Sequence, residues 1–154
     1  MKTAFIFVLY KTPQSEISRL KKEIHNIVGA NFNSPETYHI YFIDNSENGQ
    51  GYAFGVNQGI KNALKDDCEL FVIANPDISF DTLVSLDILG ASKYFDIWGL
   101  AMKQQEKIYY GGKIDRWRMS GGLVYKKSAK RFTETDFVSG SLMFIKKKVI
   151  DKIG

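Results

Sequence analysis

The sequence has a single cysteine, two histidines and no long apolar run, and each shortage excludes a class of protein. One cysteine, Cys68, cannot form an internal disulfide or supply a cysteine-cluster metal site. The histidines, His25 and His39, are far apart in the chain and indicate neither a catalytic triad nor a metal pair. No segment approaches the roughly 18 consecutive apolar residues that a membrane-spanning helix needs. Internal repeats, low-complexity tracts and domain linkers are also missing.

The residues that are present suit one globular domain. The 154 residues are 44% hydrophobic, 14% aromatic and 25% charged, which is enough apolar material for a core. The apolar run at the N-terminus is short, and Lys11-Thr12-Pro13 follows it in place of the small-residue cleavage site of a signal peptide. We therefore expect a soluble, cytoplasmic domain. Peripheral contact with a membrane surface and a homodimer both stay open.

Charge is distributed unevenly along the chain. The net charge is +4, but the stretch from Lys103 to Arg131 alone holds nine basic and two acidic residues, a net charge of +7. The remainder of the chain is therefore slightly acidic. A local basic patch of this kind favours an anionic partner.

Short apolar runs alternate with helical periodicity in the first part of the chain. Apolar runs predict a buried strand at 4–10 and further strands at 38–43 and 69–74. Apolar spacings of three and four predict helices at 15–28, at 53–65 and around Leu83, Leu86 and Leu89. This alternation predicts a parallel sheet with helices on both faces. Further along, the sequence predicts strands at 95–102 and 136–145, a helix at 146–153, and weak strands between.

A polar triplet follows each of the first three predicted strands. The triplets are Tyr10-Lys11-Thr12, Asp44-Asn45-Ser46 and Asn75-Pro76-Asp77. In open α/β sheets, ligands bind at the edge where the carboxyl ends of the strands meet. The sequence therefore predicts a ligand site formed by these triplets.

Four segments occur in an order and spacing that resemble a known family. They are VLYKTPQSEISRL (8–20), YFIDNSENGQGYAFGVNQGIKNA (41–63), LFVIANPDISF (70–80) and DFVSGSLMFIKKKVIDKIG (136–154). Together they resemble family 2 inverting glycosyltransferases of the GT-A fold, especially the rhamnosyltransferase-like branch. The resemblance covers nearly the whole chain. It implies a Rossmann-like three-layer α/β/α sandwich with a mainly parallel sheet, the GT-A fold of nucleotide-diphospho-sugar transferases.

The resemblance also implies a function and a set of site residues. A sugar would pass from a UDP-, dTDP- or GDP-linked donor to a saccharide or lipid-linked acceptor, with inversion, in the synthesis of a polysaccharide or glycolipid. The implied nucleotide-binding residues are Leu9, Tyr10, Asp44, Asn45, Gly51, Asn57 and Asn75. Asp77 would hold Mg²⁺ or Mn²⁺ at the donor diphosphate. Trp117, Asp136 and Gly140 would lie on the acceptor side.

The family's catalytic base would lie beyond the last residue of this sequence. The resemblance implies one domain over 1–154 that is incomplete at its C-terminus, with a nucleotide-binding half (1–92) and the start of an acceptor-binding half (93–154). The catalytic base is unknown, because Asp115 and Asp136 do not sit in the matching pattern. The sequence would then be part of a longer protein, a shortened gene product or a binding-only relative. We expect it to bind the donor and to transfer sugar poorly.

The individual motifs also have simpler interpretations. Asp44 can begin an Asx turn with Asn45 and Ser46. Asn75-Pro76-Asp77 can be a turn that caps a helix from Phe80, with Asp81 as another cap. The basic and aromatic stretch from Gly111 to Gly122 can be a solvated hairpin or, less favoured, a nucleic-acid contact. The segment around Gly140 can be a core strand with a glycine bulge.

The sequence bears on three other function classes. Gly49, Gly51 and Gly55 approach a dinucleotide-binding fingerprint in a glycine-rich turn that also includes Gly59. However, a βα unit precedes them, residues 44–48 intervene after the strand, and no acid ends the next strand. Nucleotidyltransferases usually carry a glycine-rich loop after the first strand, whereas Leu9–Gln14 contains no glycine. A non-catalytic nucleotide-sugar-binding module remains the main alternative.

Overall fold

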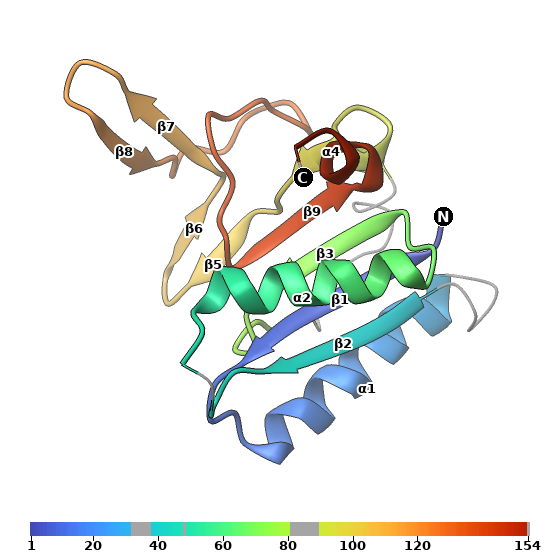
Figure 1. The fold of residues 1–154 in the computed structure, drawn as a ribbon. Coiled ribbons are helices and arrows are strands. Elements are labelled where there is room, and N and C mark those ends of the chain that lie inside the picture. Colours follow the sequence, from blue (N-terminus) through green and yellow to red (C-terminus); the bar gives the residue numbers. More distant parts are fainter. Residues whose placement is uncertain (32–37, 48, 81–89, 154) are drawn as a thin grey trace.

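The computed structural model describes residues 1–31, 38–47, 49–80 and 90–153 (Figure 1). The first part of the chain alternates strands and helices: β1 (Thr3–Leu9), α1 (Gln14–Asn31), β2 (Tyr38–Asp44), α2 (Tyr52–Lys65) and β3 (Leu70–Ala74). The second part adds β4 (Ile97–Trp98), β5 (Met102–Gln104), β6 (Lys107–Tyr109), β7 (Gly112–Asp115), β8 (Ser120–Leu123), β9 (Leu142–Lys146) and α4 (Lys147–Ile153). The predicted strands and helices of the first part are confirmed where they are described.

Five strands form one sheet in the order β2-β1-β3-β9-β4. β1 pairs in parallel with β2 and β3, whereas β9 runs antiparallel to β3 and β4. Parallel neighbours need crossover connections, and α1 and α2 lie in the crossovers that lead from β1 to β2 and from β2 to β3. The chain is therefore a mixed α/β protein in which the first three strands form the predicted parallel unit.

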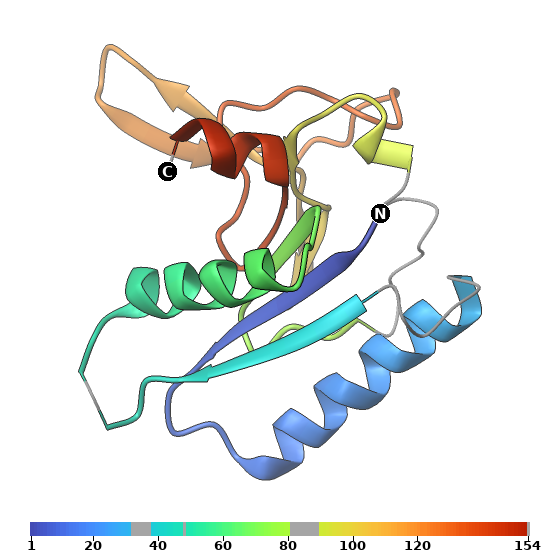
Figure 2. The ribbon, with the colours of Figure 1, turned by 45° about the vertical axis from the view of Figure 1, so that its right-hand side comes forward.

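Helices cover both faces of this sheet (Figure 2). On one face, Leu20 and Ile24 of α1 share a buried cluster with Phe7 of β1. On the other face, α2 and α4 pack against a second cluster that contains Ile6 and Phe71. Successive side chains of a strand point to opposite faces, so a strand covered on both sides must be apolar throughout. This explains why every residue of β1 and β3 is buried.

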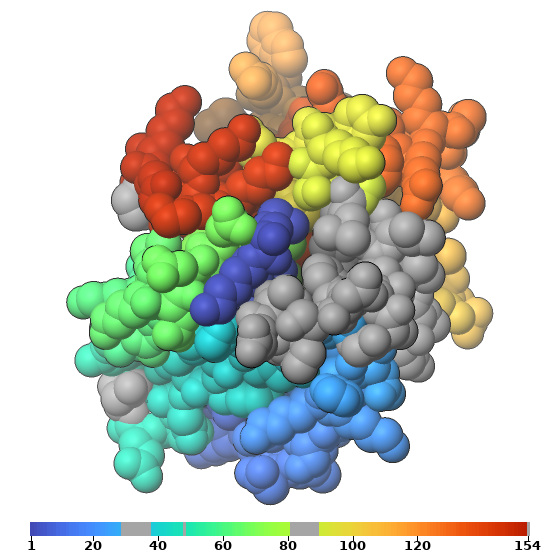
Figure 3. All heavy atoms as spheres, turned by 90° about the vertical axis from the view of Figure 1, so that its right-hand side faces the viewer, coloured from blue at the N-terminus to red at the C-terminus, as the bar shows by residue number. Residues whose placement is uncertain are grey.

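The amino end of β1 is closed by backbone contacts. Glu69 N–H donates to the Lys2 carbonyl at 2.8 Å, and Lys147 N–H donates to the Glu69 carbonyl at 2.8 Å. Figure 3 looks onto this end, where the N-terminus (dark blue) lies below α4 (red). The polar triplets lie at the other end of the sheet. None of the helices in the described part of the chain has the length and apolar content needed to cross a membrane.

Two hairpins form a separate feature that we call the arm, residues 102–123. β5 pairs antiparallel with β6, and β7 pairs antiparallel with β8. The β7–β8 hairpin projects from the body on the side where β1 and β2 end, to the left in Figure 1. The hairpin interpretation of the stretch from Gly111 to Gly122 is therefore confirmed.

The strand predicted over 95–102 is wrong in extent. Pairing with β9 covers only Ile97 and Trp98. Gly99 then leaves the sheet where the chain passes close to Val138, since a Cβ on Gly99 would lie 3.0 Å from Val138 Cβ. Residues 102–104 belong to β5, a strand of the arm.

The strand predicted over 136–145 is also wrong in extent, because it starts only at Leu142. The residues before it bond to the arm. Gly112 N–H donates to the Phe137 carbonyl at 3.0 Å, and Asp136 N–H donates to the Gly112 carbonyl at 2.9 Å. The helix predicted around Leu83 to Leu89, with Asp81 as its cap, lies outside the described residues.

Candidate functional site

The ends of the three parallel strands meet as the sequence predicted. Leu9 pairs with Asp44 at the end of β1 and β2, and Asn45 N–H donates to the Leu9 carbonyl at 3.0 Å. β3 ends beside them, with Ala74 paired to Phe7. We call this group the carboxyl edge, and it consists of Leu9, Tyr10, Asp44, Asn45 and Asn75.

Asp44 forms the Asx turn that its triplet allowed. Its Oδ1 accepts from the Ser46 backbone N–H at 2.8 Å and from the Ser46 hydroxyl at 2.5 Å. These two hydrogen bonds hold the pKa of the Asp44 carboxyl below its usual value. The carboxylate is also exposed, so it is an ionised acceptor in contact with solvent.

Ser46 joins the loops that follow β1 and β2. Besides its bonds to Asp44, the Ser46 Oγ accepts from the Lys11 backbone N–H at 2.8 Å. Tyr10, next to Lys11, exposes 65% of its surface, and its N–H donates to the Thr12 hydroxyl at 3.3 Å. The first two polar triplets are therefore linked. The exposed Tyr10 ring has Lys11 Nζ over it, at 5.5 Å from the ring centroid.

Asn45 positions the start of α2. Its side chain is buried, and Nδ2 donates to the carbonyls of Gln50 at 2.7 Å and Gly51 at 3.2 Å. Its Oδ1 is buried without a hydrogen-bond partner. Gly51 is the N-cap residue of α2 and makes no side-chain cap, so the first turn of the helix opens at the carboxyl edge.

The predicted glycine-rich turn divides into two parts with different roles. Gly49 has a φ of +61°, a left-handed backbone that glycine adopts at little cost, and Gly51 is exposed. Gly55 and Gly59, by contrast, lie inside α2 and are buried. A Cβ on Gly59 would lie 2.3 Å from Ile6 Cγ2. The prediction that all four glycines line a turn is wrong, because these two let α2 pack closely on β1.

Asn57 is not brought to the carboxyl edge by any contact among the described residues. The buried stripe of α2 consists of Gly55, Gly59 and Ala63. At about 100° per residue, Asn57 lies about 200° from Gly55 and faces away from the sheet. Its side chain is exposed.

The turn that carries Asp77 is fixed by α1. Arg19 donates to the carbonyls of Pro76 at 2.9 Å and Ile78 at 3.1 Å, on either side of Asp77. Glu23 binds Arg19 at 2.9 Å and accepts from the Phe80 N–H at 2.8 Å. Asp77 itself is exposed. The turn is therefore held by its backbone, which leaves the Asp77 carboxylate available.

No three His, Cys, Asp or Glu side chains gather at a point that could hold a metal ion, within the residues that the structure describes. Mg²⁺ is commonly bound by one or two carboxylates together with substrate phosphates. The single exposed carboxylate of Asp77 fits a site of that kind, which a diphosphate would complete. It does not fit a metal cage made by the protein alone.

The three predicted acceptor-side residues lie in different places. Gly140 is at the carboxyl edge: the Tyr52 hydroxyl donates to its carbonyl at 3.5 Å, and the next residue, Ser141, accepts from the Asn75 N–H at 2.9 Å. Asp136 lies at the base of the arm, and Trp117 lies at the tip of the β7–β8 hairpin. The structure therefore joins Gly140 to the donor-side residues and separates Trp117 from them.

Asp136 has a structural task. Its Oδ2 accepts from the Ile114 N–H at 2.8 Å, and its Oδ1 lies 3.5 Å from Lys113 Nζ. The bond from Ile114, and then the charge of Lys113, lower the pKa of Asp136. Both carboxylate oxygens therefore serve to hold the arm against the segment that leads to β9.

Sequence reasoning gives no role to three residues that shape the site, Arg19, Tyr52 and Ser141, and it gives Ser46 a role only in the Asx turn of Asp44. Ser46 lies in the second polar triplet, and Ser141 lies in the segment 136–154 that carries part of the family resemblance. The sequence gives no sign of the contacts that Arg19 makes, because a charged residue on the polar side of an amphipathic helix is expected to face solvent. Tyr52 follows the glycines closely, so an aromatic residue at a helix start beside a ligand edge was the signal that could have found it.

No family model and no curated protein matches this sequence. Among solved structures, the chain is similar to the crystal structure of A197 from STIV. The TM-score is 0.50, with 14% sequence identity, and the match covers 100% of this chain and 69% of that chain. At this identity the similarity concerns the fold alone, the mixed α/β arrangement described above.

Proposed function

We propose that this chain binds a nucleotide-diphosphate sugar at the carboxyl edge and belongs to a glycosyltransferase of the GT-A fold. The transfer would go to a saccharide or lipid-linked acceptor with inversion. The observation that carries the proposal is the meeting of three parallel strand ends with the first turn of α2 and the Asp77 turn. Ligands of open α/β sheets bind at such an edge.

The chemistry of the edge suits a nucleotide diphosphate. Asp44 is an ionised, exposed acceptor, and a nucleoside offers imide N–H and hydroxyl donors. The open N-terminus of α2 offers backbone N–H groups and the positive end of the helix dipole to phosphate. The Tyr10 ring, which is 65% exposed, offers a surface on which a base can stack.

A divalent cation would neutralise the negative charge that develops on the departing nucleoside diphosphate. Asp77 would hold it, with the donor phosphates as the other ligands. The Arg19–Glu23 pair keeps the turn in place from behind, through the Pro76 and Ile78 carbonyls and the Phe80 N–H. Asn75 is fixed in turn by Ser141.

One observation favours the alternative, a nucleotide-sugar-binding module that does not transfer sugar. Asp115 and Asp136, the two acids nearest the predicted acceptor side, are both already engaged. Asp136 is bonded to Ile114 and paired with Lys113. Asp115 accepts from the N–H groups of Trp117 and Arg118. Each acid thus already holds the arm together, which makes both poor candidates for a general base.

Calorimetric titration of the chain with UDP, dTDP and GDP, with and without Mn²⁺, tests the proposal. We expect one nucleotide to bind in a metal-dependent way. Asp44→Asn and Asp77→Asn should each weaken that binding by about tenfold or more, since each removes a charged partner. Asp77→Asn should also abolish the effect of Mn²⁺.

Asp67→Asn is the matched control, because Asp67 is exposed and follows the opposite end of α2. It should bind like the wild type. Absence of binding to all three nucleotides would overturn the proposal. Nucleotide binding without sugar transfer, measured with the matching donor, would favour the binding module.

A further inference from the structure

The tip of the β7–β8 hairpin exposes two large apolar side chains. Trp117 is 97% exposed and Met119 is 90% exposed, more than any other large hydrophobic residue of the described chain. Ile114 and Leu123, on the strands behind the tip, are also exposed, at 49% and 44%. Burying these groups in an apolar environment would be favourable, and the fold itself does not bury them.

The tip is a formed turn. Asp115 Oδ1 accepts from the N–H of Trp117 at 3.0 Å and of Arg118 at 3.1 Å. Met119 has a φ of +49°, a left-handed backbone in which glycine or asparagine would be less strained. The apolar Met119 side chain is thus exposed at a position where the backbone conformation favours glycine or asparagine.

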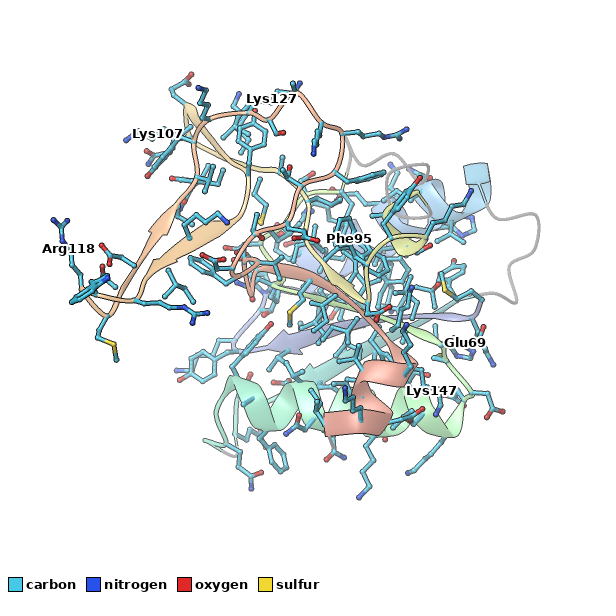
Figure 4. The ribbon with its side chains drawn as sticks, turned by 90° about the horizontal axis from the view of Figure 1, so that it is seen from above. Glu69, Phe95, Lys107, Arg118, Lys127 and Lys147 are labelled. Carbon is cyan, nitrogen blue, oxygen red and sulfur yellow. The ribbon has the colours of Figure 1, made fainter. Side chains whose placement is uncertain are left out.

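Basic residues flank this apolar tip in the sequence, with Arg116 and Arg118 on either side of Trp117. All nine lysines and arginines between Lys103 and Arg131 are exposed. Figure 4 shows Arg118 at the outer end of the hairpin, pointing away from the body, with Lys107 and Lys127 at some distance from it, along the upper edge of the view. The ion pairs Lys113–Asp136 and Arg118–Asp115 offset only part of this charge.

We propose that the β7–β8 hairpin is a membrane anchor that inserts Trp117 and Met119 among the headgroups of an anionic lipid surface. The flanking arginines and lysines would bind the lipid phosphates. Tryptophan prefers the membrane interface, and each basic residue near an anionic leaflet adds to the attraction.

A convex, protruding tip suits a lipid surface better than the other anionic partners. A sugar needs a concave site that surrounds it. Nucleic-acid binding would use basic residues and stacking aromatic rings, which gives no reason for an exposed methionine beside the tryptophan. The pairing of two apolar side chains with a rim of positive charge is the pattern of interfacial membrane binding.

The hairpin is also joined firmly to the carboxyl edge. Gly112 of β7 packs under the Phe137 ring, and Asp136 holds the Ile114 N–H at 2.8 Å. The same segment continues to Gly140, which meets Tyr52 at the start of α2. A hairpin bound to a membrane would therefore hold the carboxyl edge at a set orientation to that surface. The anchoring does not depend on the proposed nucleotide binding.

Co-sedimentation of the whole chain with vesicles tests the anchor. We expect binding to phosphatidylcholine vesicles that contain phosphatidylserine and much weaker binding to pure phosphatidylcholine. The double variant Trp117→Ser/Met119→Ser should bind on the order of tenfold more weakly. Arg116→Gln/Arg118→Gln should lose about fivefold for each charge removed.

Matched controls distinguish binding through the hairpin from binding through exposed charges or exposed apolar residues elsewhere in the chain. Lys61→Gln/Lys65→Gln removes two exposed charges from α2, and Ile153→Ser removes a residue of α4 that is 69% exposed. Both should bind nearly as the wild type. Equal losses in the control and hairpin variants would overturn the proposal.

Fluorescence distinguishes insertion from surface attraction, because Trp98 is buried and Trp117 is exposed. With anionic vesicles, we expect a blue shift and protection from iodide quenching in the wild type and in Trp98→Phe, but neither in Trp117→Phe. Vesicle binding without change at Trp117 would overturn insertion. Binding to single-stranded RNA but not to vesicles, lost in the same hairpin variants, would overturn the membrane anchor.

Discussion

Asn45 shows how one side chain can fix the geometry of a whole edge. Its amide joins the end of β2 to the start of α2 through the carbonyls of Gln50 and Gly51, while its backbone N–H bonds Leu9 of β1. The side chain is only 5% exposed, so its hydrogen bonds are shielded from water. Its role is to position the groups of the site.

Removing the Asn45 amide should loosen this edge. We expect Asn45→Ala to lower the free energy of unfolding by about 1–3 kcal/mol, because two carbonyl acceptors lose their donor. Asn45→Asp should cost more at neutral pH, since a carboxylate would face two carbonyl oxygens, and should recover as falling pH protonates it. Urea unfolding at pH 7 and pH 4 measures both variants. Equal stability of the two at neutral pH would contradict this assignment.

Tyr41 ties β2 to the end of α2. Its hydroxyl donates to Asp66 Oδ2 at 2.5 Å. Burial, and then this hydrogen bond, raise the pKa of Tyr41 well above its usual value. The folded chain therefore keeps a proton that an unfolded tyrosine loses near pH 10. This contribution to stability is fully present below about pH 10 and is lost as the pH rises toward the folded-state pKa.

Tyr41→Phe should reveal this linkage. The variant should be less stable at neutral pH, because Asp66 loses a donor, and its stability should fall less steeply than that of the wild type above about pH 10. Chemical unfolding across alkaline pH measures the two slopes. Tyr125→Phe, at a residue that is 55% exposed, is the control. Parallel pH curves for Tyr41→Phe and the wild type would rule out this coupling.

Among the secondary-structure elements, α2 depends most on small residues. Gly55, Gly59 and Ala63 recur every four residues and face the sheet. A Cβ on Gly55 would lie 2.6 Å from Val8 Cγ1, and one on Gly59 would lie 2.3 Å from Ile6 Cγ2. Their absence lets the helix lie close to β1 and brings its first turn to the carboxyl edge. Close packing accounts for two of the glycines that looked like part of a phosphate-binding turn.

Gly59→Ala should therefore destabilise the chain even though alanine favours helices. We expect a loss of about 1–3 kcal/mol from overpacking against Ile6, larger than the roughly 1 kcal/mol gained in helix propensity. Thermal unfolding with the single variants and with Gly59→Ala/Ile6→Ala tests the contact. The double variant should lose less than the two single losses added together. If the stability losses of the two single variants simply add in the double variant, the contact between Gly59 and Ile6 does not limit how closely α2 packs on β1.

At the scale of the whole molecule, the parallel unit and the arm are joined by residues 136–141. Phe137 packs over Gly112 and bonds its N–H, while Gly140 and Ser141 meet Tyr52 and Asn75. The same short segment thus touches the base of the arm and the carboxyl edge. This connection lets the arm act together with the site.

Gly112→Ala should break that connection. A Cβ on Gly112 would lie 2.0 Å from Phe137 Cζ, so the ring must move. We expect a loss of about 1–3 kcal/mol in the free energy of unfolding and faster proteolysis of the arm. Gly122→Ala is the matched control on the facing strand, because no atom lies within 4 Å of its added Cβ. Unchanged proteolysis in Gly112→Ala would show that the arm is held in another way.

The sequence by itself determined the parallel unit and the position of the carboxyl edge. Apolar runs such as 4–9 and 70–74 favour burial, and the polar triplets that follow them show where burial stops. These are local patterns, readable without knowing which strands are neighbours. The proposed sugar chemistry rests on that edge and on the family resemblance, and the titration decides it.

Only the tertiary structure decided which distant residues share a place. It set Ser141 beside Asn75, Arg19 behind the Asp77 turn, and Gly59 against Ile6. It also showed that Trp117 stands clear of the body. None of this is local, because it depends on the antiparallel placement of β9, on the packing of α1 and α2, and on the way the arm leaves the sheet. Sequence periodicity shows which face of an element is apolar, whereas the packing of the elements decides what that face meets.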